Sequence, residues 1–209
     1  HTLVVVGAPT YTADVGYVFL QDGADYLKSD FKLVTLGVDW EVEVEFTIPA
    51  SIDQDANHMI FGDCANGEQA LWVMIVKDSG KVTAATKNED GDSATIGSAE
   101  GSDLRDAAKH TIRIEYKSSA SLARLWIDGT FADGTAVTAN KTAKDSGAGG
   151  LFTLGGTVGA IGGVQFADVT IHRARVASSV PWLHHANFGP EGKWTIGHED
   201  APARVGRMR

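Results

Sequence analysis

The chain has 209 residues, of which 43% are hydrophobic, a formal net charge of −9 and a single cysteine. This length suits one substantial domain that buries about 70% of its unfolded surface without covalent cross-links. One cysteine excludes an internal disulfide. The acidic charge argues against a nucleic-acid partner, which would select a basic surface. No apolar run approaches the ~20 residues of a membrane-spanning helix, so no membrane insertion is expected.

The N-terminal part is predicted to consist of short extended segments separated by turns that contain glycine, proline or aspartate. Residues 1–21 are expected to form an arm or edge strands that precede the main domain. The predicted extended segments lie at 3–6, 16–21, 26–27 and 31–36.

The clearest strand signal is the segment W-E-V-E-V-E-F-T-I at residues 40–48. Its apolar side chains fall on one side of an extended chain, and Glu41, Glu43 and Glu45 fall on the other. A period of two predicts a strand with one buried face and one polar face. The buried face requires a second layer to cover it, so this strand predicts a sandwich.

The middle of the chain continues with short apolar strands at 58–61 and 69–77, a hairpin arm at 81–87 and a further strand at 94–96. A helical turn is expected only between Ser102 and Ala108. There, Ser102 is a suitable N-cap, and the carboxylates of Asp103 and Asp106 favour a helix start.

The second half of the chain again contains segments in which apolar and polar residues alternate. Residues 109–117 place Ile112 and Ile114 inward, and residues 121–128 place Leu125 inward. Strands are also expected at 131–137, 151–154 and 164–176. Short, regular strands joined by Gly and Asp turns indicate an antiparallel sandwich, which we assign to residues 22–177.

Four segments together resemble the laminin-G-like, concanavalin A-like lectin-glucanase family. They are D-G-A-D-Y-L at 22–27, W-E-V-E-V-E-F at 40–46, K-H-T-I-R-I-E-Y with A-R-L-W-I-D-G at 109–116 and 123–129, and G-G-V-Q-F-A-D-V-T-I-H-R-A-R-V at 162–176. The resemblance implies an all-β, two-sheet antiparallel jelly-roll sandwich. It also implies a ligand site on the concave face or rim loops of a largely non-enzymatic module that binds glycans or proteins. The family's calcium-ligating aspartates cannot be matched to positions of this chain.

The outward residues of the alternating strands are the candidate ligand site. A tryptophan ring beside charged hydrogen-bonding groups suits a sugar, whose C–H face stacks on the ring while its hydroxyls bind donors and acceptors. The alternative is ordinary cross-strand pairing of Glu and Arg on a solvated surface. The candidate ligand-binding residues are Trp126, Arg124, Arg113, Glu43, Glu45 and His172.

Glu41 and Glu45 also allow a glycosidase interpretation. Retaining glucanases that resemble this jelly roll use the outer carboxylates of a Glu-x-Asp-x-Glu strand, whereas this chain has Glu43 in the middle. Retaining chemistry needs carboxyls about 5–5.5 Å apart. Residues i and i+4 of a strand have Cα atoms about 13 Å apart, so the two side chains would have to converge, and the motif that surrounds the glucanase strand is not found here. A non-enzymatic polar strand face is therefore favoured.

Asp53, Asp55 and Asn57 have the spacing that opens a calcium loop. His58 stands where the loop glycine is required, and Cys64 stands where the bidentate glutamate is required. A loop with Asx turns is favoured, so no cofactor is predicted, and calcium is retained only as the alternative.

The segment 178–209 is predicted to be an irregular C-terminal arm, because it contains three prolines and no strand-length alternation. It nevertheless contains large apolar residues that a disordered tail would lack. These residues suggest contact with the domain's own sandwich or with a neighbouring subunit. The candidate assembly contacts are Trp182, Phe188, Trp194, Arg204, Arg207 and Arg209.

Three function classes follow from the sequence. The favoured one is a non-enzymatic binding or structural module displayed on a virion or outside a cell, such as a capsid decoration or appendage protein. It would contact glycans or neighbouring subunits, including those of a homo-oligomer. The alternatives are a secreted carbohydrate-binding lectin module and a glycoside hydrolase or lyase that uses Glu41 and Glu45.

Overall fold

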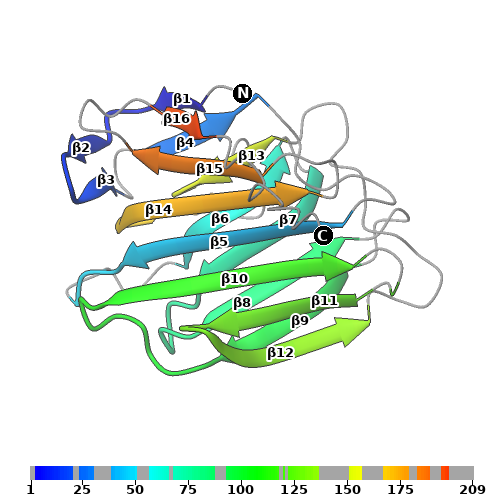
Figure 1. Ribbon diagram of the computed structural model, residues 1–209. Helices are drawn as coiled ribbons and strands as arrows, with labels where there is room; N and C mark the ends of the chain where they lie inside the picture. The colour runs from blue at the N-terminus through cyan, green and yellow to red at the C-terminus, as the bar shows by residue number, and fades with distance from the viewer. Residues whose placement is uncertain are drawn as a thin grey trace, which may run out of the picture.

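Two antiparallel sheets face each other in the computed structural model (Figure 1). The part of the chain that it describes contains no α-helix. The described residues are 3–20, 24–30, 39–50, 57–65, 68–87, 93–117, 120, 122–136, 151–156, 167–178, 183–188 and 194–197.

The first sheet contains seven strands among the described residues, and β1 and β9 are its edges. Its β6–β7–β8–β9 part is a meander of consecutive antiparallel strands. In spatial order the strands are β1 (Leu3–Val6), β4 (Tyr26–Ser29), β13 (Phe152–Leu154), β6 (His58–Ala65), β7 (Glu68–Ile75), β8 (Val82–Lys87) and β9 (Ser93–Glu100).

The second sheet contains nine strands among the described residues and lies in front in Figure 1. Its main path is β12 (Thr130–Ala136), β11 (Leu122–Ile127), β10 (Lys109–Lys117), β5 (Trp40–Thr47), β14 (Val169–Ser178), β15 (Leu183–Phe188) and β16 (Trp194–Gly197). The strand β3 (Gly16–Phe19) pairs with the first half of β14, and β2 (Thr10–Thr12) pairs with β3. β15 pairs with the second half of β14.

The hydrophobic core lies between the sheets and follows the predicted alternation. Buried and partly exposed residues alternate along the whole of β5 and β11, and along β10 after its exposed first residue. Val42, Val44, Ile114 and Leu125 are all fully buried. The prediction of an antiparallel sandwich built on residues 40–48 is therefore confirmed.

The predicted helical turn at 102–108 is wrong, because this segment contains only bends and irregular backbone. The side chains of its aspartates accept hydrogen bonds from main-chain N–H groups two residues ahead, Asp103 from Arg105 and Asp106 from Ala108. Such local bonds compete with helical hydrogen bonds. In addition, Ala107 has a φ of 62°, which a right-handed helix does not allow.

The C-terminal segment differs from the predicted irregular arm, since it contains strands β15 and β16. Main-chain pairing to β14 positions β15, and this pairing depends little on side-chain alternation. The adjacent histidines 184 and 185 break the apolar alternation that reveals the other strands. The extended segment predicted at 31–36 lies outside the described residues.

Candidate functional site

The outward side chains of β11, β10, β5 and β14 form one polar face of the nine-stranded sheet, here called the outer face. The strand register places Arg113 opposite Trp126 on one side and opposite Glu43 on the other. Arg175 of β14 is also opposite Glu43. All of the predicted ligand residues lie on this face, because each is an outward residue of one of these four strands.

An aromatic pair covers the β11–β12 end of the outer face. The Trp126 ring lies 5.9 Å from the Phe131 ring at 73°. The guanidinium of Arg113 lies 4.5 Å from the centre of the Trp126 ring, a cation–π contact that covers one face of the indole. Phe131 is 57% exposed. Sequence reasoning missed Phe131, whose place beside Trp126 depends on a register shift between β11 and β12.

Ion pairs connect the strands across the centre of the outer face. Arg113 Nη2 donates a hydrogen bond of 3.0 Å to Glu41 Oε2. Exposed pairs of this kind contribute about 0–1 kcal/mol each. Cross-strand charge pairing, the predicted alternative, is thus present in the middle of the face, while the buried Nε atoms of Arg113 and Arg175 have no hydrogen-bond partner among the described residues. The other pairs in this region are Lys117 with Glu115 at 3.2 Å and with Asp39 at 3.5 Å, Arg124 with Glu115 at 3.6 Å, and Arg175 with Glu43 at 3.7 Å.

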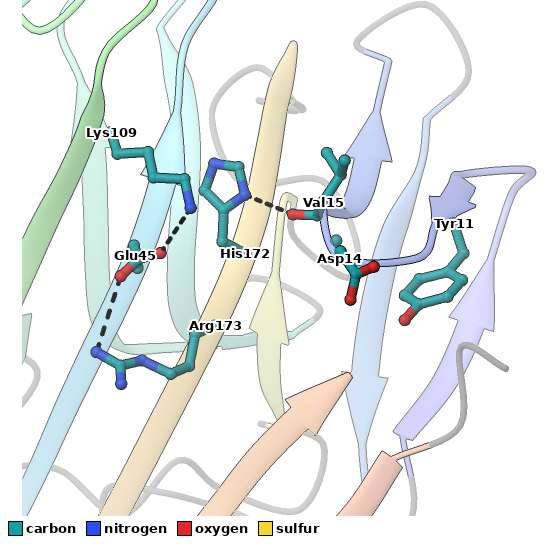
Figure 2. Close-up of a pocket in the computed structure, with 8 residues that line it drawn as sticks. Tyr11, Asp14, Val15, Glu45, Lys109, His172 and Arg173 are labelled. Carbon is teal, nitrogen blue, oxygen red and sulfur yellow. Dashed lines mark hydrogen bonds and ion pairs between the residues drawn. The ribbon is translucent and has the colours of Figure 1, made fainter. Parts of the chain in front are cut away.

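A pocket of about 240 Å³ opens on the outer face beside β14, and we call it the bulge pocket. Glu45, Lys109 and Arg173 lie on one side, Asp14 and Tyr11 lie on the other, and His172 lies between them (Figure 2). Val15 and Gly16 complete the lining.

A β-bulge between Ile171 and Arg173 builds this pocket. Strict alternation along β14 would point Arg173 into the core, but the bulge leaves both His172 and Arg173 at the surface and returns Ala174 to the core. The β2–β3 hairpin packs against the same place. A Cβ atom on Gly16 would lie 2.1 Å from the carbonyl oxygen of Ile171, so only glycine allows this approach.

Both ring nitrogens of His172 are occupied within the protein. Nδ1 donates to the carbonyl oxygen of Val15, and Nε2 is 2.8 Å from Oγ1 of Thr47. These bonds tie the β2–β3 turn to β5. His172 was predicted as a ligand residue, but its contacts make it a positioning residue that holds one wall of the pocket.

The charged groups of the bulge pocket differ in how fully they are paired. Glu45 is 3.4 Å from Lys109 Nζ and 3.8 Å from Arg173 Nη2, and Arg173 Nη2 is also 3.5 Å from Glu43. Asp14 has no cation within ion-pair distance among the described residues. Its φ of 63° places it in the left-handed region, where aspartate and asparagine are tolerated. Lys109, Arg173, Asp14 and Tyr11 were not predicted, because they meet only through the folded topology.

A buried histidine links three segments at the rim near the start of β10. Nδ1 of His110 is 2.9 Å from Asp128 Oδ2, and Nε2 is 2.9 Å from Asp106 Oδ1. Burial acts to lower the pKa of His110, but the hydrogen bonds to Asp128 and Asp106 outweigh it and hold this pKa above its usual value. His110 and the Asp128-Gly129 turn, two of the features that supported the family resemblance, are therefore in direct contact in the folded chain.

The arrangement of Glu41 and Glu45 does not favour the glycosidase alternative. Glu41 is paired sideways with Arg113 on β10, and Glu45 is paired with Lys109 on β10 and Arg173 on β14. The two carboxylates are thus held by cations on neighbouring strands instead of converging on a shared centre.

The remaining predicted residues are only partly described. Among the three candidate calcium ligands, only Asn57 is described, and its side chain accepts a hydrogen bond of 2.9 Å from the main-chain N–H of Lys77. Asp53 and Asp55 lie outside the described residues. No cluster of three or more metal-ligating His, Cys, Asp or Glu side chains occurs in the described ranges.

Of the candidate assembly contacts, Phe188 and Trp194 are opposite each other in the β15–β16 ladder. Trp182, Arg204, Arg207 and Arg209 lie outside the described residues. The described part of the chain has no helix with the length and apolar character needed to cross a membrane.

No protein-family model and no curated protein matches the sequence. Solved structures do share the fold. Tailspike protein 2 of Escherichia coli O157:H7 bacteriophage CAB120 has a TM-score of 0.58 and 14% identity over 84% of this chain and 25% of its own. The LG4-5 domains of mouse laminin alpha1 have a TM-score of 0.51 and 18% identity over 84% of this chain and 40% of theirs.

The CBM40 module of the Ruminococcus gnavus IT-sialidase has a TM-score of 0.50 and 18% identity over 66% of this chain and 74% of its own. The chain spans less than half of the tailspike and laminin chains. Identities this low show the fold alone. The chain has the laminin-G-like, concanavalin A-like jelly-roll fold that the sequence resemblance implied.

Proposed function

We propose that this chain is a non-enzymatic glycan-binding module displayed outside a cell or on a virion, and that the outer face of the nine-stranded sheet is its binding surface. The observation that carries the proposal is the convergence on this face of an aromatic pair, a row of charged hydrogen-bonding groups and the bulge pocket.

The chemistry of this face suits sugars. An exposed aromatic ring at Phe131 offers a stacking surface for sugar C–H groups, and the carboxylates and guanidinium groups offer acceptors and donors for hydroxyls. Solved structures of the same fold include a sialidase CBM40 module and a phage tailspike protein. Their occurrence supports a surface-displayed binding role for this chain.

A glycan array probed with the full chain tests the proposal. We expect binding to a defined subset of glycans and its loss in Trp126→Ala, which removes both the indole and the support for Phe131 and Arg113. Glu100→Gln on β9 of the other sheet is the control, and its binding should match that of the wild type. An array with no bound glycan would contradict the proposal.

An assay for reducing sugar released from a panel of polysaccharides tests the enzymatic alternative. We expect no release, because Glu41 and Glu45 are held apart by their cationic partners. Release by the wild type that disappears in Glu41→Gln would instead show a glycosidase.

The proposal that this chain is an assembly component of a virion is supported by the position of β16 in the nine-stranded sheet. Among the described residues, the hairpin of β15 and β16 leaves β16 at the edge of the sheet's main path, and an edge strand is able to pair with a neighbouring chain. Light scattering of the full chain over a range of concentrations is the test. A self-associating appendage component should form a defined oligomer, and a strictly monomeric chain would contradict this form.

A further inference from the structure

We infer that the bulge pocket is the subsite that determines specificity and that it holds one uncharged, hydroxyl-rich sugar ring, with Asp14 as the principal acceptor of its hydroxyl hydrogen bonds. This inference rests on the proposed function and adds the place and the charge class of the ligand. It follows from the state of each polar group in the pocket.

Asp14 is the acceptor that the fold leaves unused. It lies in the β2–β3 turn, which is closed by a hydrogen bond of 3.1 Å from Val15 N–H to the Thr12 carbonyl, so its backbone is fixed without its side chain. Its side chain is exposed, and no cation of the described residues neutralises it. A carboxylate held at a pocket wall accepts hydrogen bonds from sugar hydroxyls at little ordering cost.

Arg173 and Lys109 are donors held in place but not saturated. The contacts of Arg173 with Glu43 and Glu45 are ion pairs of 3.5 and 3.8 Å, which are longer than hydrogen bonds of good geometry. Lys109 reaches Glu45 at 3.4 Å, and its side chain is 62% exposed. Both side chains line the pocket and retain donor capacity for ligand oxygens.

The balance of charge in the pocket selects against an acidic sugar. Two cations and two carboxylates line it, and Arg173 already faces the carboxylates of both Glu43 and Glu45. A ligand carboxylate would be the third around this guanidinium and would also meet the unpaired Asp14. An uncharged sugar uses both the donors and the acceptors and encounters no such repulsion.

The size and one wall of the pocket also suit a single ring. A volume of about 240 Å³ is below the ~300–1,000 Å³ of pockets for drug-sized ligands. Tyr11 forms the outer wall, and its ring is held 5.1 Å from the ring of Tyr17, which is only 6% exposed. A partly exposed aromatic ring that packs against a buried one offers a surface for the apolar face of a sugar.

The experiment uses the full chain on an array that contains both neutral oligosaccharides, such as the lactose, maltose and mannose series, and acidic ones, such as sialyllactose and glucuronate-containing glycans. The pocket variants are Asp14→Asn and Tyr11→Ala. Asparagine is chosen because it tolerates the left-handed backbone of position 14. Glu100→Gln is the matched carboxyl-to-amide control on the other sheet, and thermal unfolding verifies that all variants are folded.

We expect the wild type to prefer neutral glycans and to keep its affinity when salt rises to 0.5 M, because screening acts on charge–charge attraction. Asp14→Asn should weaken this binding about tenfold, or about 1.4 kcal/mol, and Tyr11→Ala should also weaken it, whereas Glu100→Gln should not.

Preference for acidic glycans, or full binding by both pocket variants, would overturn this inference. If both pocket variants bind fully while Trp126→Ala loses binding, the proposed function stands and the binding site lies at the aromatic end of the outer face. A wild type that binds no glycan would overturn both proposals.

Discussion

Replacing Gly16 with alanine tests directly how the bulge pocket is built. A Cβ atom at this position would lie 2.1 Å from the carbonyl oxygen and 2.9 Å from the carbonyl carbon of Ile171. The closest ordinary carbon–oxygen contacts are about 3.3 Å. The β2–β3 hairpin would therefore have to move away from β14 by roughly 1 Å or more. The Val15 carbonyl would move with it and leave His172.

Two effects set the size of the destabilisation. The φ of Gly16 is 122°, a conformation that costs a residue with a side chain about 1–3 kcal/mol. Forcing an extra carbon into a filled contact adds about 1–3 kcal/mol. Gly16→Ala should thus lower the free energy of unfolding by about 2–6 kcal/mol, a large part of the total stability of about 5–15 kcal/mol that is typical of a domain.

Gly129→Ala is the matched control, because Gly129 also has a positive φ of 74° but nothing lies within 4 Å of the Cβ position. It should lose only the conformational term of about 1–2 kcal/mol. Urea unfolding of the wild type and both variants measures the difference, and glycan binding reports the pocket. If Gly16→Ala is no more destabilising than Gly129→Ala, the hairpin does not press on the bulge as described.

Three further predictions concern the rim, the outer face and the core. The pKa of His110 is raised in the folded state, so the stabilisation by this histidine is complete below the unfolded pKa and is lost as pH rises through the folded pKa. Between pH 6 and pH 9 the free energy of unfolding should therefore fall more in the wild type than in His110→Gln. Equal pH dependence of the two proteins would refute this prediction. A double-mutant cycle between Arg113 and Glu41 should give a coupling free energy of about 1 kcal/mol or less, because both side chains are about one third exposed. This coupling free energy should decrease in high salt. A value that salt does not change would contradict the interpretation as a surface ion pair. Phe46→Ala should cost about 3–5 kcal/mol in urea unfolding, because the ring is fully buried between the sheets, and a loss below 1 kcal/mol would argue against the described core.

The strands were predictable from the sequence where one face of the strand is buried and the other is exposed to solvent. In β5 and β10 every second residue is apolar, because the pleat sends alternate side chains to opposite faces, and the predicted limits of β10 agree with the structure. The placement of Trp126, Arg113 and Glu43 on a common face follows from the same rule. Local alternation gives the side of each strand on which a residue lies, and the common face depends in addition on the four strands being neighbours in one sheet, as the structure shows.

The bulge pocket could not be predicted by the same reasoning, because it depends on contacts between distant segments. Tyr11 and Asp14 come from the β2–β3 hairpin, while Arg173 follows more than 150 residues later in the sequence. β2 has only three residues, Thr-Tyr-Thr, which are too few for an alternation to be recognised in the sequence. The available signal was in β14, where I-H-R-A-R-V at 171–176 has an arginine at a position that strict alternation assigns to the core. A buried unpaired guanidinium is too costly, so this residue indicated a bulge.

The same bulge explains why a ligand site is expected at this point of the outer face and not at its centre. In the regular part of the sheet each glutamate is opposite a cation or beside one, and Glu41, Glu43 and Glu115 each have a cationic partner at 3.0–3.7 Å. At the bulge, two successive residues of β14 face outward, and the register with β5 shifts. Cross-strand pairing is then incomplete. Arg173 is shared between Glu43 and Glu45 at 3.5 and 3.8 Å, and Asp14, on the adjoining hairpin, is a carboxylate with no cationic partner among the described residues. Hydrogen-bonding capacity that the fold does not use is what a polar ligand needs, so the interruption of the sheet is the physical origin of the proposed subsite.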